Sequence, residues 1–394
     1  MKEICPRNKC TGCGACVSSC THSAVTLQPD PCGYMYPIIN QDACVDCGLC
    51  QISCPSVKLQ TLRYPLNNLA VTCKTEAETL SCASGGAATL LSGTIIKSGG
   101  VVYGCDGTDI RNVHHARIDT IEGLERLKGS KYVQSFVGDV YRQIRQDLKD
   151  GINVLFIGTP CQVAGLYGFL HGKTYENLYT ADLVCHGIPS QKMLNDNIDL
   201  YTLKKGTECR LKFREKVLSS GRKTNRVKYG ITYGWFFQDY PFDKPQTQIP
   251  YHKDPYMLGF ISGLTFRPNC YECRYACIAR VSDLTLSDYW GLSAGAGFDK
   301  TKGVSNILVN TQHGQQLWDM TKSVTTFKER DIIEALRGNG QLQAPSPRHP
   351  KHNQFEKIYP QVGFKNAVKK CSRKYLLRLF FSKSISYCRS LVRI

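Results

Sequence analysis

Segments of helical composition alternate with short apolar segments along most of the chain after residue 68. Helices are predicted at 87–97, 137–149, 162–170 and 312–322, and strands at 101–103, 153–157, 181–184 and 305–310. Alternation of this kind is typical of strands that form one sheet with helices packed against it. The pattern predicts an α/β core with a mixed, partly parallel sheet.

Two regions depart from this alternation. Near the N-terminus, 24–27 and 36–40 are predicted to be two short strands of a small α+β module, and 60–68 is predicted to be a linker. The segment 211–248, rich in aromatic and basic residues, has β character and predicts an inserted sheet. No run of about 18 consecutive apolar residues occurs, which excludes a membrane-spanning helix.

Eight of the 21 cysteines form two runs with identical spacing, C-x2-C-x2-C-x3-C. This spacing resembles that of bacterial ferredoxins with two 4Fe-4S clusters, in which the fourth cysteine of each run ligates the other cluster. We therefore assign one cluster to Cys10, Cys13, Cys16 and Cys54, and the other to Cys44, Cys47, Cys50 and Cys20. Residues 1–60 are predicted to form this ferredoxin-like domain, although Thr21 replaces the usual proline after the first run.

Zinc and disulfides are the alternative uses of these cysteines. Zinc sites favour two well-separated C-x2-C pairs over three evenly spaced cysteines followed by a fourth. Disulfides require an oxidising compartment, yet Met1 leads directly to Cys5 without an apolar leader segment. We therefore expect a cytoplasmic protein with reduced thiols.

Four further cysteines are candidates for a third cluster. Cys161 lies where a predicted strand ends and a helix begins, and Cys185 follows another predicted strand. Ligands bind at such strand ends in open α/β sheets, and a helix N-terminus is expected to lower the pKa of Cys161. We predict a third 4Fe-4S cluster on Cys161, Cys185, Cys270 and Cys273. The alternatives are four buried hydrophobic cysteines, or Cys277 as a competing ligand.

Five motifs follow in order between Thr72 and Phe355. They are Ser84-Gly-Gly86 with Gly99-Gly-Val-Val-Tyr-Gly104; Gly129-Ser-Lys-Tyr-Val-Gln-Ser135; Gly158-Thr-Pro-Cys-Gln162; Cys185-His-Gly-Ile-Pro-Ser190; and Arg280-Val-Ser-Asp-Leu-Thr-Leu-Ser-Asp-Tyr-Trp-Gly291. In these motifs the chain resembles the beta subunits of coenzyme F420 hydrogenase and dehydrogenase, of the bacterial type with an N-terminal ferredoxin domain. The resemblance implies an N-terminal-like region at 69–150 and a C-terminal-like region at 151–345. It also implies an FAD-dependent oxidoreductase module with its own 4Fe-4S cluster.

The same resemblance implies a set of FAD contacts. They are Ser84, Gly85 and Gly86 near the ring; Ser130, Lys131 and Tyr132 near the phosphates or ribityl chain; and Thr159. Glycines admit a close approach of the backbone, and a lysine neutralises pyrophosphate charge. On spacing alone, the glycines also fit a plain connection between two elements, and Lys131 also fits a solvated surface position.

His186 is the candidate catalytic residue. Imidazole titrates near neutral pH, so His186 is predicted to donate a proton to substrate or flavin, with a structural role as the alternative. Asp283 and Asp288 flank a predicted strand and are interpreted as turn and hydrogen-bonding residues.

The chain is strongly basic, with a formal net charge of +18, and no acidic residue follows Glu356. Residues 346–394 form a basic tail whose part 365–394 interleaves lysine and arginine with apolar residues. This pattern fits a peripheral contact with the inner face of the cell membrane, a docking tail for an acidic protein, or a terminal helix packed on the core. Nucleic acid is not expected, because no recognition fold accompanies the charge. The oligomeric state is left open.

Two classes of function follow. In the first, the protein is an iron-sulfur flavoprotein oxidoreductase that passes electrons between the ferredoxin-type clusters, the inner cluster and FAD, to or from an unknown small-molecule substrate or redox partner protein. FAD is needed because a cluster carries one electron and a hydride carries two. In the second, the protein is an electron-relay subunit without a substrate site that serves a partner enzyme. Nicotinamide use does not follow from the residues, because no separate G-x-G-x-x-G motif is present. Deazaflavin use is an analogy with the family and does not follow from the residues either.

Overall fold

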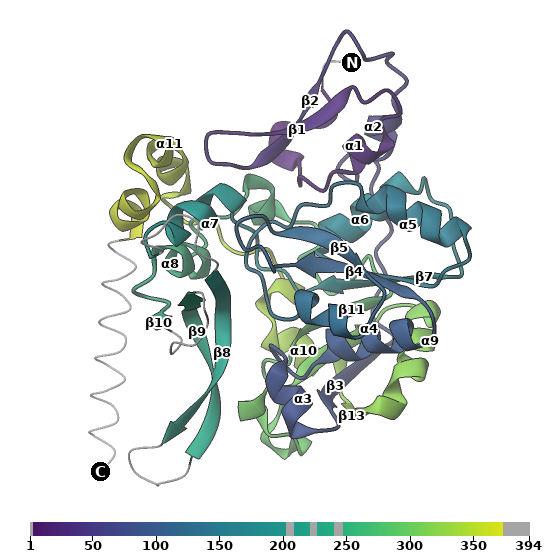
Figure 1. The fold of residues 1–394 in the computed structure, drawn as a ribbon, viewed down its shortest axis with the longest axis vertical. Coiled ribbons are helices and arrows are strands. Elements are labelled where there is room, and N and C mark those ends of the chain that lie inside the picture. The colour runs from purple at the N-terminus through teal and green to yellow at the C-terminus, as the bar shows by residue number, and fades with distance from the viewer. Residues whose placement is uncertain (1–2, 202–208, 221–226, 240–246, 373–394) are drawn as a thin grey trace.

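The computed structural model describes residues 3–201, 209–220, 227–239 and 247–372. Most of this part of the chain surrounds one eight-stranded sheet with the strand order β13-β3-β12-β11-β7-β6-β4-β5 (Figure 1). These strands are β3 Asn67–Cys73, β4 Val101–Asp106, β5 His114–Ile118, β6 Val154–Gly158, β7 Leu178–Leu183, β11 Leu284–Asp288, β12 Ser305–Val309 and β13 Thr325–Glu329.

The middle of this sheet is parallel and its edges are antiparallel. Strands β4, β6, β7 and β11 pair in parallel, whereas β5, β12, β3 and β13 join through antiparallel pairs. The mixed, partly parallel sheet expected from the sequence is therefore confirmed.

Helices cover both faces of the sheet. The helices are α1 Ala15–Ser19, α2 Leu49–Ile52, α3 Glu76–Ser81, α4 Ala87–Lys97, α5 Val140–Lys149, α6 Pro160–Phe169, α7 Gln191–Ile198, α8 Pro255–Ile261, α9 Gln312–Thr321, α10 Ile332–Gly338 and α11 His352–Val362. Leu91 of α4 and Leu317 of α9 pack in one apolar cluster with sheet residues, and Ile144 of α5 and Leu166 of α6 pack in another. Burial of these apolar faces is the main source of stability for such layers.

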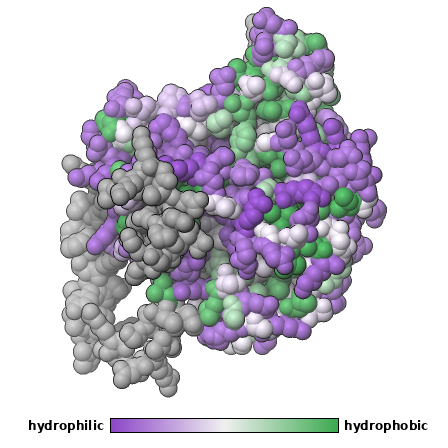
Figure 2. All heavy atoms as spheres, in the orientation of Figure 1, coloured by the Kyte–Doolittle hydropathy of each residue, from purple (hydrophilic) through white to green (hydrophobic). Residues whose placement is uncertain are grey.

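The N-terminal lobe, residues 3–59, packs on the α5–α6 side of the sheet (Figure 1). It contains α1, α2 and a two-stranded antiparallel hairpin of β1 Val25–Pro29 and β2 Met35–Ile39. Its outer surface carries exposed apolar side chains such as Val45 and Leu59, and Figure 2 shows hydrophobic atoms on this projecting lobe.

Two glycines of α6 allow the lobe to approach the core closely. A Cβ at Gly168 would collide with the carbonyl oxygen of Ser53, and a Cβ at Gly165 would lie 2.9 Å from the Cys13 sulfur. A side chain at either position would separate the helix from the cysteine loops of the lobe.

The segment predicted as an inserted sheet forms three antiparallel strands in the order β10-β9-β8. They are β8 Cys209–Ser220, β9 Val227–Asp239 and β10 Thr247–Pro250. Helices α7, α8 and α11 lie next to this sheet in Figure 1.

Several expectations about individual elements need revision. The helix expected at 162–170 begins two residues earlier, at Pro160, and the linker expected at 60–68 ends where β3 begins at Asn67. Strands β3, β5 and β13 were not predicted as separate strands, whereas β11 is the strand expected between Asp283 and Asp288. Among the residues described, no helix is both long enough and apolar enough to span a bilayer.

The first part of the basic tail packs against the core. Residues 364–372 are helical, and Ala367, Val368 and Cys371 are buried in a cluster with Tyr359. Of the three alternatives for the tail, a terminal helix packed on the core therefore describes it up to residue 372. The remainder of the predicted membrane contact, 373–394, lies outside the described residues.

Replacement of Gly168 by alanine tests the contact between α6 and the lobe. The added methyl collides with Ser53, and overpacking of this kind costs about 1–3 kcal/mol. We expect a thermal unfolding midpoint several degrees below that of the wild type. Gly93→Ala in α4 is the matched control, because its methyl meets only ordinary contacts and should stabilise the helix by about 0.5–1 kcal/mol. Equal midpoints for the two variants would contradict the close contact.

Candidate functional site

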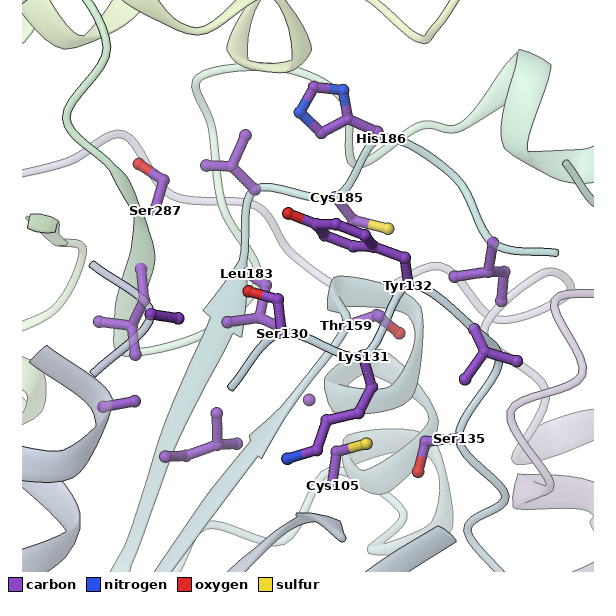
Figure 3. A pocket seen from close by; sticks show the side chains of 18 of the residues that line it. Cys105, Ser130, Lys131, Tyr132, Ser135, Thr159, Leu183, Cys185, His186 and Ser287 are labelled. Atoms are coloured by element: carbon purple, nitrogen blue, oxygen red, sulfur yellow. The ribbon is translucent and has the colours of Figure 1, made fainter. Parts of the chain in front are cut away.

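A cavity of about 750 Å³ lies at the carboxyl ends of the parallel strands. Its walls include Cys105 of β4, Thr159 after β6, Cys185 after β7 and Ser287 of β11 (Figure 3). Open α/β sheets bind ligands at this edge, and the volume lies within the range of about 300–1,000 Å³ typical of small-molecule sites. The cavity is therefore the candidate site for a cofactor and a substrate.

Six of the seven predicted FAD contacts line this cavity. They are Ser84, Gly86, Ser130, Lys131, Tyr132 and Thr159. Gly85 is not among the lining residues: a Cβ there would collide with Val71 and Ser305, so this glycine is needed for packing against β3 and β12. The structure thus brings the loop at 84–86 and the loop at 129–132, more than forty positions apart in the sequence, to the same cavity.

The Lys131 side chain is half-buried and turned toward Cys105 (Figure 3). Its ammonium donates hydrogen bonds of 2.8 Å to the carbonyl oxygens of Leu127 and Lys128. These carbonyls end the 3-10 helix Glu122–Leu127, where a cation is favoured. Burial lowers the pKa of Lys131. Lys131 therefore holds the loop 129–132 in place, and its predicted contact with a pyrophosphate stays a prediction.

Aromatic rings form one wall of the cavity. The Tyr132 ring stacks on Phe260 with 4.7 Å between centroids and lies 5.5 Å from Phe213 of the inserted sheet. His186 lies beyond Tyr132, with its ring 6.4 Å from that of Phe260 (Figure 3).

His186 is exposed and lines the cavity. Desolvation by the neighbouring protein atoms lowers the pKa of His186 below its ordinary value. The neutral ring is thus favoured near pH 7. Its backbone carbonyl is fixed by a 2.6 Å hydrogen bond from the Ser346 hydroxyl.

A largely buried ion pair borders the same cavity. Arg214 of β8 reaches from the inserted sheet to Asp288 at the end of β11, with one hydrogen bond of 2.9 Å, and also donates to the carbonyl oxygen of Ala83. Asp288 is therefore a cavity residue, whereas Asp283 accepts hydrogen bonds from Thr180 and Thr311 and is structural. Sequence reasoning missed Arg214, because only the folded insertion brings it to the cavity.

The four cysteines predicted for a third cluster come together beside this cavity. Cys161 is the second residue of α6, Cys185 follows β7, and Cys270 and Cys273 lie in and just after the 3-10 helix Pro268–Glu272. Burial, followed by the nearby Cys273, Cys185 and Cys270 thiols, raises the pKa of Cys161 well above its ordinary value. The expected lowering by the helix N-terminus was therefore wrong, because burial among other thiols outweighs it. Such a set is suited to a cationic iron centre that would compensate the clustered thiolates.

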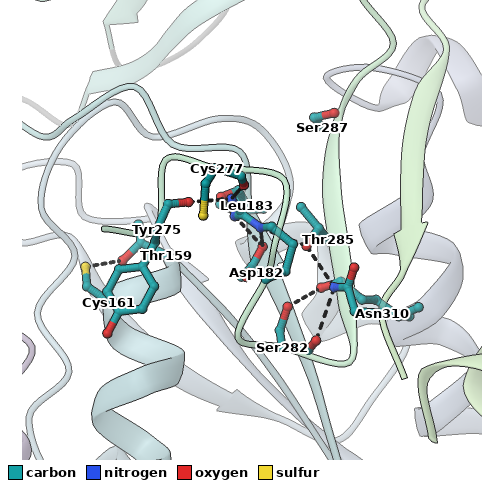
Figure 4. A network of polar contacts seen from close by, with 12 residues as sticks. Thr159, Cys161, Asp182, Leu183, Tyr275, Cys277, Ser282, Thr285, Ser287 and Asn310 are labelled. Carbon is teal, nitrogen blue, oxygen red and sulfur yellow. Dashed lines mark hydrogen bonds and ion pairs between the residues drawn. The ribbon is translucent and has the colours of Figure 1, made fainter. Parts of the chain in front are cut away.

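A buried ion pair holds the loop that carries two of these cysteines. Arg280 pairs with Asp182 of β7 at 2.7 Å, and both side chains are at most 1 % exposed. The same guanidinium donates to the carbonyl oxygens of Tyr275, Cys277 and Leu183 (Figure 4). It thereby fixes the loop after Cys273 against the end of β7.

Cys277, the competing ligand considered from the sequence, lies close enough to Cys273 to contribute to the raised pKa of that thiol, after burial. Its thiol donates to the carbonyl oxygens of Arg274 and Ala279 within its own loop. Thr159, in contrast, has its hydroxyl 3.2 Å from the Cys161 sulfur (Figure 4).

Cysteines of the two runs also lie near one another. Burial, followed by the nearby Cys13, Cys10 and Cys54 thiols, raises the pKa of Cys16 well above its ordinary value, so the four predicted ligands of the first cluster are neighbours. Cys20 and Cys47 act likewise on Cys50. The two sets differ in exposure: Cys10, Cys13 and Cys54 are buried, whereas Cys47 is exposed. In the part of the chain that the structure describes, no three His, Cys, Asp or Glu side chains converge closely enough to hold a single metal ion.

The two runs have the same local backbone. Gly14 and Gly48 each follow the second cysteine of a run, with φ of 80° and 75°, and each begins a short helix. Positive φ is accessible to glycine without strain, and it turns the chain around the space between the thiols. The repeated conformation fits two equivalent cluster sites.

The first cysteine set and the third both contact α6, one helical turn apart on the same face. The Cys13 sulfur packs on Gly165, one helical turn after Cys161. Tyr141 and Tyr275 are both under the electrostatic influence of Cys13 and Cys161. Three cysteine sets are therefore arranged in order from the exposed lobe to the cavity.

Two segments of the chain match models of known protein families. Residues 152–335 match the family model for the C terminus of the coenzyme F420 hydrogenase/dehydrogenase beta subunit, and residues 9–57 match that of the 4Fe-4S dicluster domain. The resemblance to this family that the sequence motifs indicated is thereby confirmed for residues 152–335. The match of residues 9–57 supports iron-sulfur clusters at the N-terminus.

Similar proteins occur among curated sequences and among solved structures. The uncharacterized protein MJ1349 of Methanocaldococcus jannaschii is 25% identical over 200 residues, which cover 43% of this chain and 55% of the relative. The match thus spans little more than half the length of that relative. A chain from the structure of the F420-reducing NiFe hydrogenase complex of Methanosarcina barkeri is 15% identical with a TM-score of 0.45, covering 79% of this chain and 93% of the other.

A Cys161→Ala variant tests the third set. We expect it to lose one cluster's worth of iron while it keeps the dicluster domain loaded, because Cys161 is a member of the set and Cys10 to Cys54 are not touched. Iron per chain after anaerobic reconstitution is the measurement. Cys277→Ala is the control and should keep the wild-type iron content, since its thiol bonds only to its own loop. Unchanged iron in Cys161→Ala would remove this residue from the ligand set.

Proposed function

We propose that this protein is an iron-sulfur flavoprotein oxidoreductase that passes electrons between two ferredoxin-type 4Fe-4S clusters, a third 4Fe-4S cluster and FAD, to or from a substrate in the cavity. The observation that carries the proposal is the order of the cysteine sets. One set contains the exposed Cys47, a second contains the buried Cys10, Cys13 and Cys54, and the inner set lies beside the cavity. Members of a family of hydrogenase and dehydrogenase subunits are suited to such electron transfer.

The cavity has the features that FAD requires. Its walls contain small residues where the backbone can approach a planar ring, Ser84 and Gly86, and hydroxyl groups on the loop 129–132 and at Thr159. When bound, FAD supplies the conversion between one-electron and two-electron chemistry.

The protein residues around the cavity have separate roles in this proposal. The aromatic wall of Tyr132 and Phe260 excludes water from one side. Neutral His186 holds or accepts a proton at a ring nitrogen. The Arg214–Asp288 pair presents a fixed dipole without net charge, which orients a polar substrate.

The exposed lobe fits a contact with a redox partner protein. Cys47 is exposed, and Val45 and Leu59 on the same lobe are 59% and 61% exposed. Apolar surface beside a redox centre is typical of transient electron-transfer contacts, which are small and easily separated.

FAD content is the direct test of the proposal. We expect anaerobically purified protein to release about one FAD per chain on denaturation, because one cavity of suitable size is present among the described residues. Absorbance and chromatography of the supernatant give the identity and the amount.

A loaded dicluster domain without any flavin, in protein reconstituted with excess FAD, would contradict the flavoprotein proposal. That result would favour the relay subunit, in which the clusters serve a partner enzyme. A paramagnetic signal after dithionite reduction is the internal control, because it shows that the clusters themselves are intact.

A further inference from the structure

Two cysteines outside the three sets lie together at the edge of the same cavity. Cys73 ends β3, and Cys82 follows α3, so that α3 Glu76–Ser81 connects them. Strand β3 points the same way as β11, because both pair antiparallel with β12. Cys73 is therefore at the carboxyl edge of the sheet, and Cys82 is one of the residues that line the cavity.

Gly86 shows how close the two sulfurs are. A Cβ at Gly86 would collide with the Cys73 sulfur and lie 3.2 Å from the Cys82 sulfur. Gly86 also has a φ of 96°, a conformation that favours glycine. Both thiols thus occupy the space where a larger residue would have its side chain.

The surroundings make the two thiols unequal. The interaction with Cys73 comes first among the effects that lower the pKa of Cys82 to about 6; Thr89, Ser81 and Lys128 lower it further, and burial opposes them. The same interaction raises the pKa of Cys73, and burial and Glu78 add to this. Lys216 of β8, which donates to the carbonyl oxygens of Thr79 and Ser84, is also within electrostatic reach of both sulfurs.

We propose that Cys73 and Cys82 are a redox-active dithiol that exchanges with a small disulfide bound in the cavity. Cys82, on the cavity wall, is the attacking sulfur, and Cys73, behind it, is the resolving sulfur. This activity goes beyond electron transfer through clusters and flavin and does not depend on it.

The exchange is balanced in two steps. The Cys82 thiolate attacks one sulfur of the substrate disulfide, so that a mixed disulfide forms and the first substrate thiolate leaves. Cys73 then loses its proton and attacks the Cys82 sulfur, which forms the Cys73–Cys82 disulfide and releases the second thiolate. The two leaving thiolates take up the two protons of the dithiol. A dithiol reductant returns the pair to its starting state by the reverse reaction.

A cysteine with only a structural role has different neighbours from those of Cys82. Cys371 is buried among apolar residues, and burial raises the pKa of its thiol. Cys82 instead has hydroxyl donors, a lysine and a second sulfur around it, and it borders a cavity. A thiolate near neutral pH with a neighbouring sulfur is the arrangement that thiol exchange requires.

The test uses the full chain under anaerobic conditions. The protein is equilibrated at pH 7 with mixtures of reduced and oxidised glutathione, quenched by rapid alkylation, digested and analysed by mass spectrometry. We expect a peptide that links Cys73 to Cys82 to rise with the oxidised fraction and to disappear in dithiothreitol. In Cys73→Ser, Cys82 should instead carry one glutathione, because the resolving sulfur is absent.

Reaction rate provides a second measurement. Removal of Cys73 takes away the main cause of the low pKa of Cys82. We therefore expect alkylation of Cys82 at pH 7 to be roughly tenfold slower in Cys73→Ser than in the fully reduced wild type. The wild-type rate should rise as the pH passes through about 6, where the thiolate forms.

Cys105→Ser is the matched control, because Cys105 lines the same cavity. It should leave the linked peptide unchanged. The proposal is overturned if both cysteines of the folded wild type are alkylated separately in every glutathione mixture, while iron content shows that the protein is intact. A linked peptide that forms only after denaturation would overturn it as well. Because neither readout involves flavin, a protein without FAD can still pass the test.

Discussion

Close contact between α6 and the N-terminal lobe is the constraint on which the functional arrangement depends. Gly165 and Gly168 present no side chains to the lobe, so the Cys13 sulfur and the Ser53 carbonyl reach the helix backbone. The same helix begins one turn earlier with Cys161, a member of the inner set. One short helix therefore determines the separation between the outer cysteines and those beside the cavity, and its glycines are required for packing rather than for flexibility.

A buried ion pair keeps the loop that carries two of the inner cysteines in position. Arg280 and Asp182 are almost fully buried, and the removal of one partner from such a pair typically costs about 3–5 kcal/mol. The guanidinium also satisfies three carbonyl oxygens of the loop that follows Cys273 and of the end of β7. Loops that carry ligands need such support, since they lack the repeating hydrogen bonds of helices and strands.

Local patterns predicted some elements well and others poorly. The helix Ala87–Lys97 has the bounds expected from its composition, because glycines mark both its beginning and its end. The cysteine runs predicted which thiols gather, since their spacing is itself local. Strand order, the packing role of Gly85, the raised pKa of Cys161 and the arrival of Arg214 at Asp288 depend on contacts between distant segments. Cys73 and Cys82 were missed for the same reason, because an ordinary strand and helix bring them together.

The three-stranded insertion is encoded by one continuous stretch, 209–250, between α7 and α8. It adds no strand to the eight-stranded sheet, yet it contributes Arg214, Phe213 and Lys216 to the surroundings of the cavity. A sequence change confined to this segment can therefore alter one side of the cavity while the strand order of the eight-stranded sheet and the cysteine loops stay as they are.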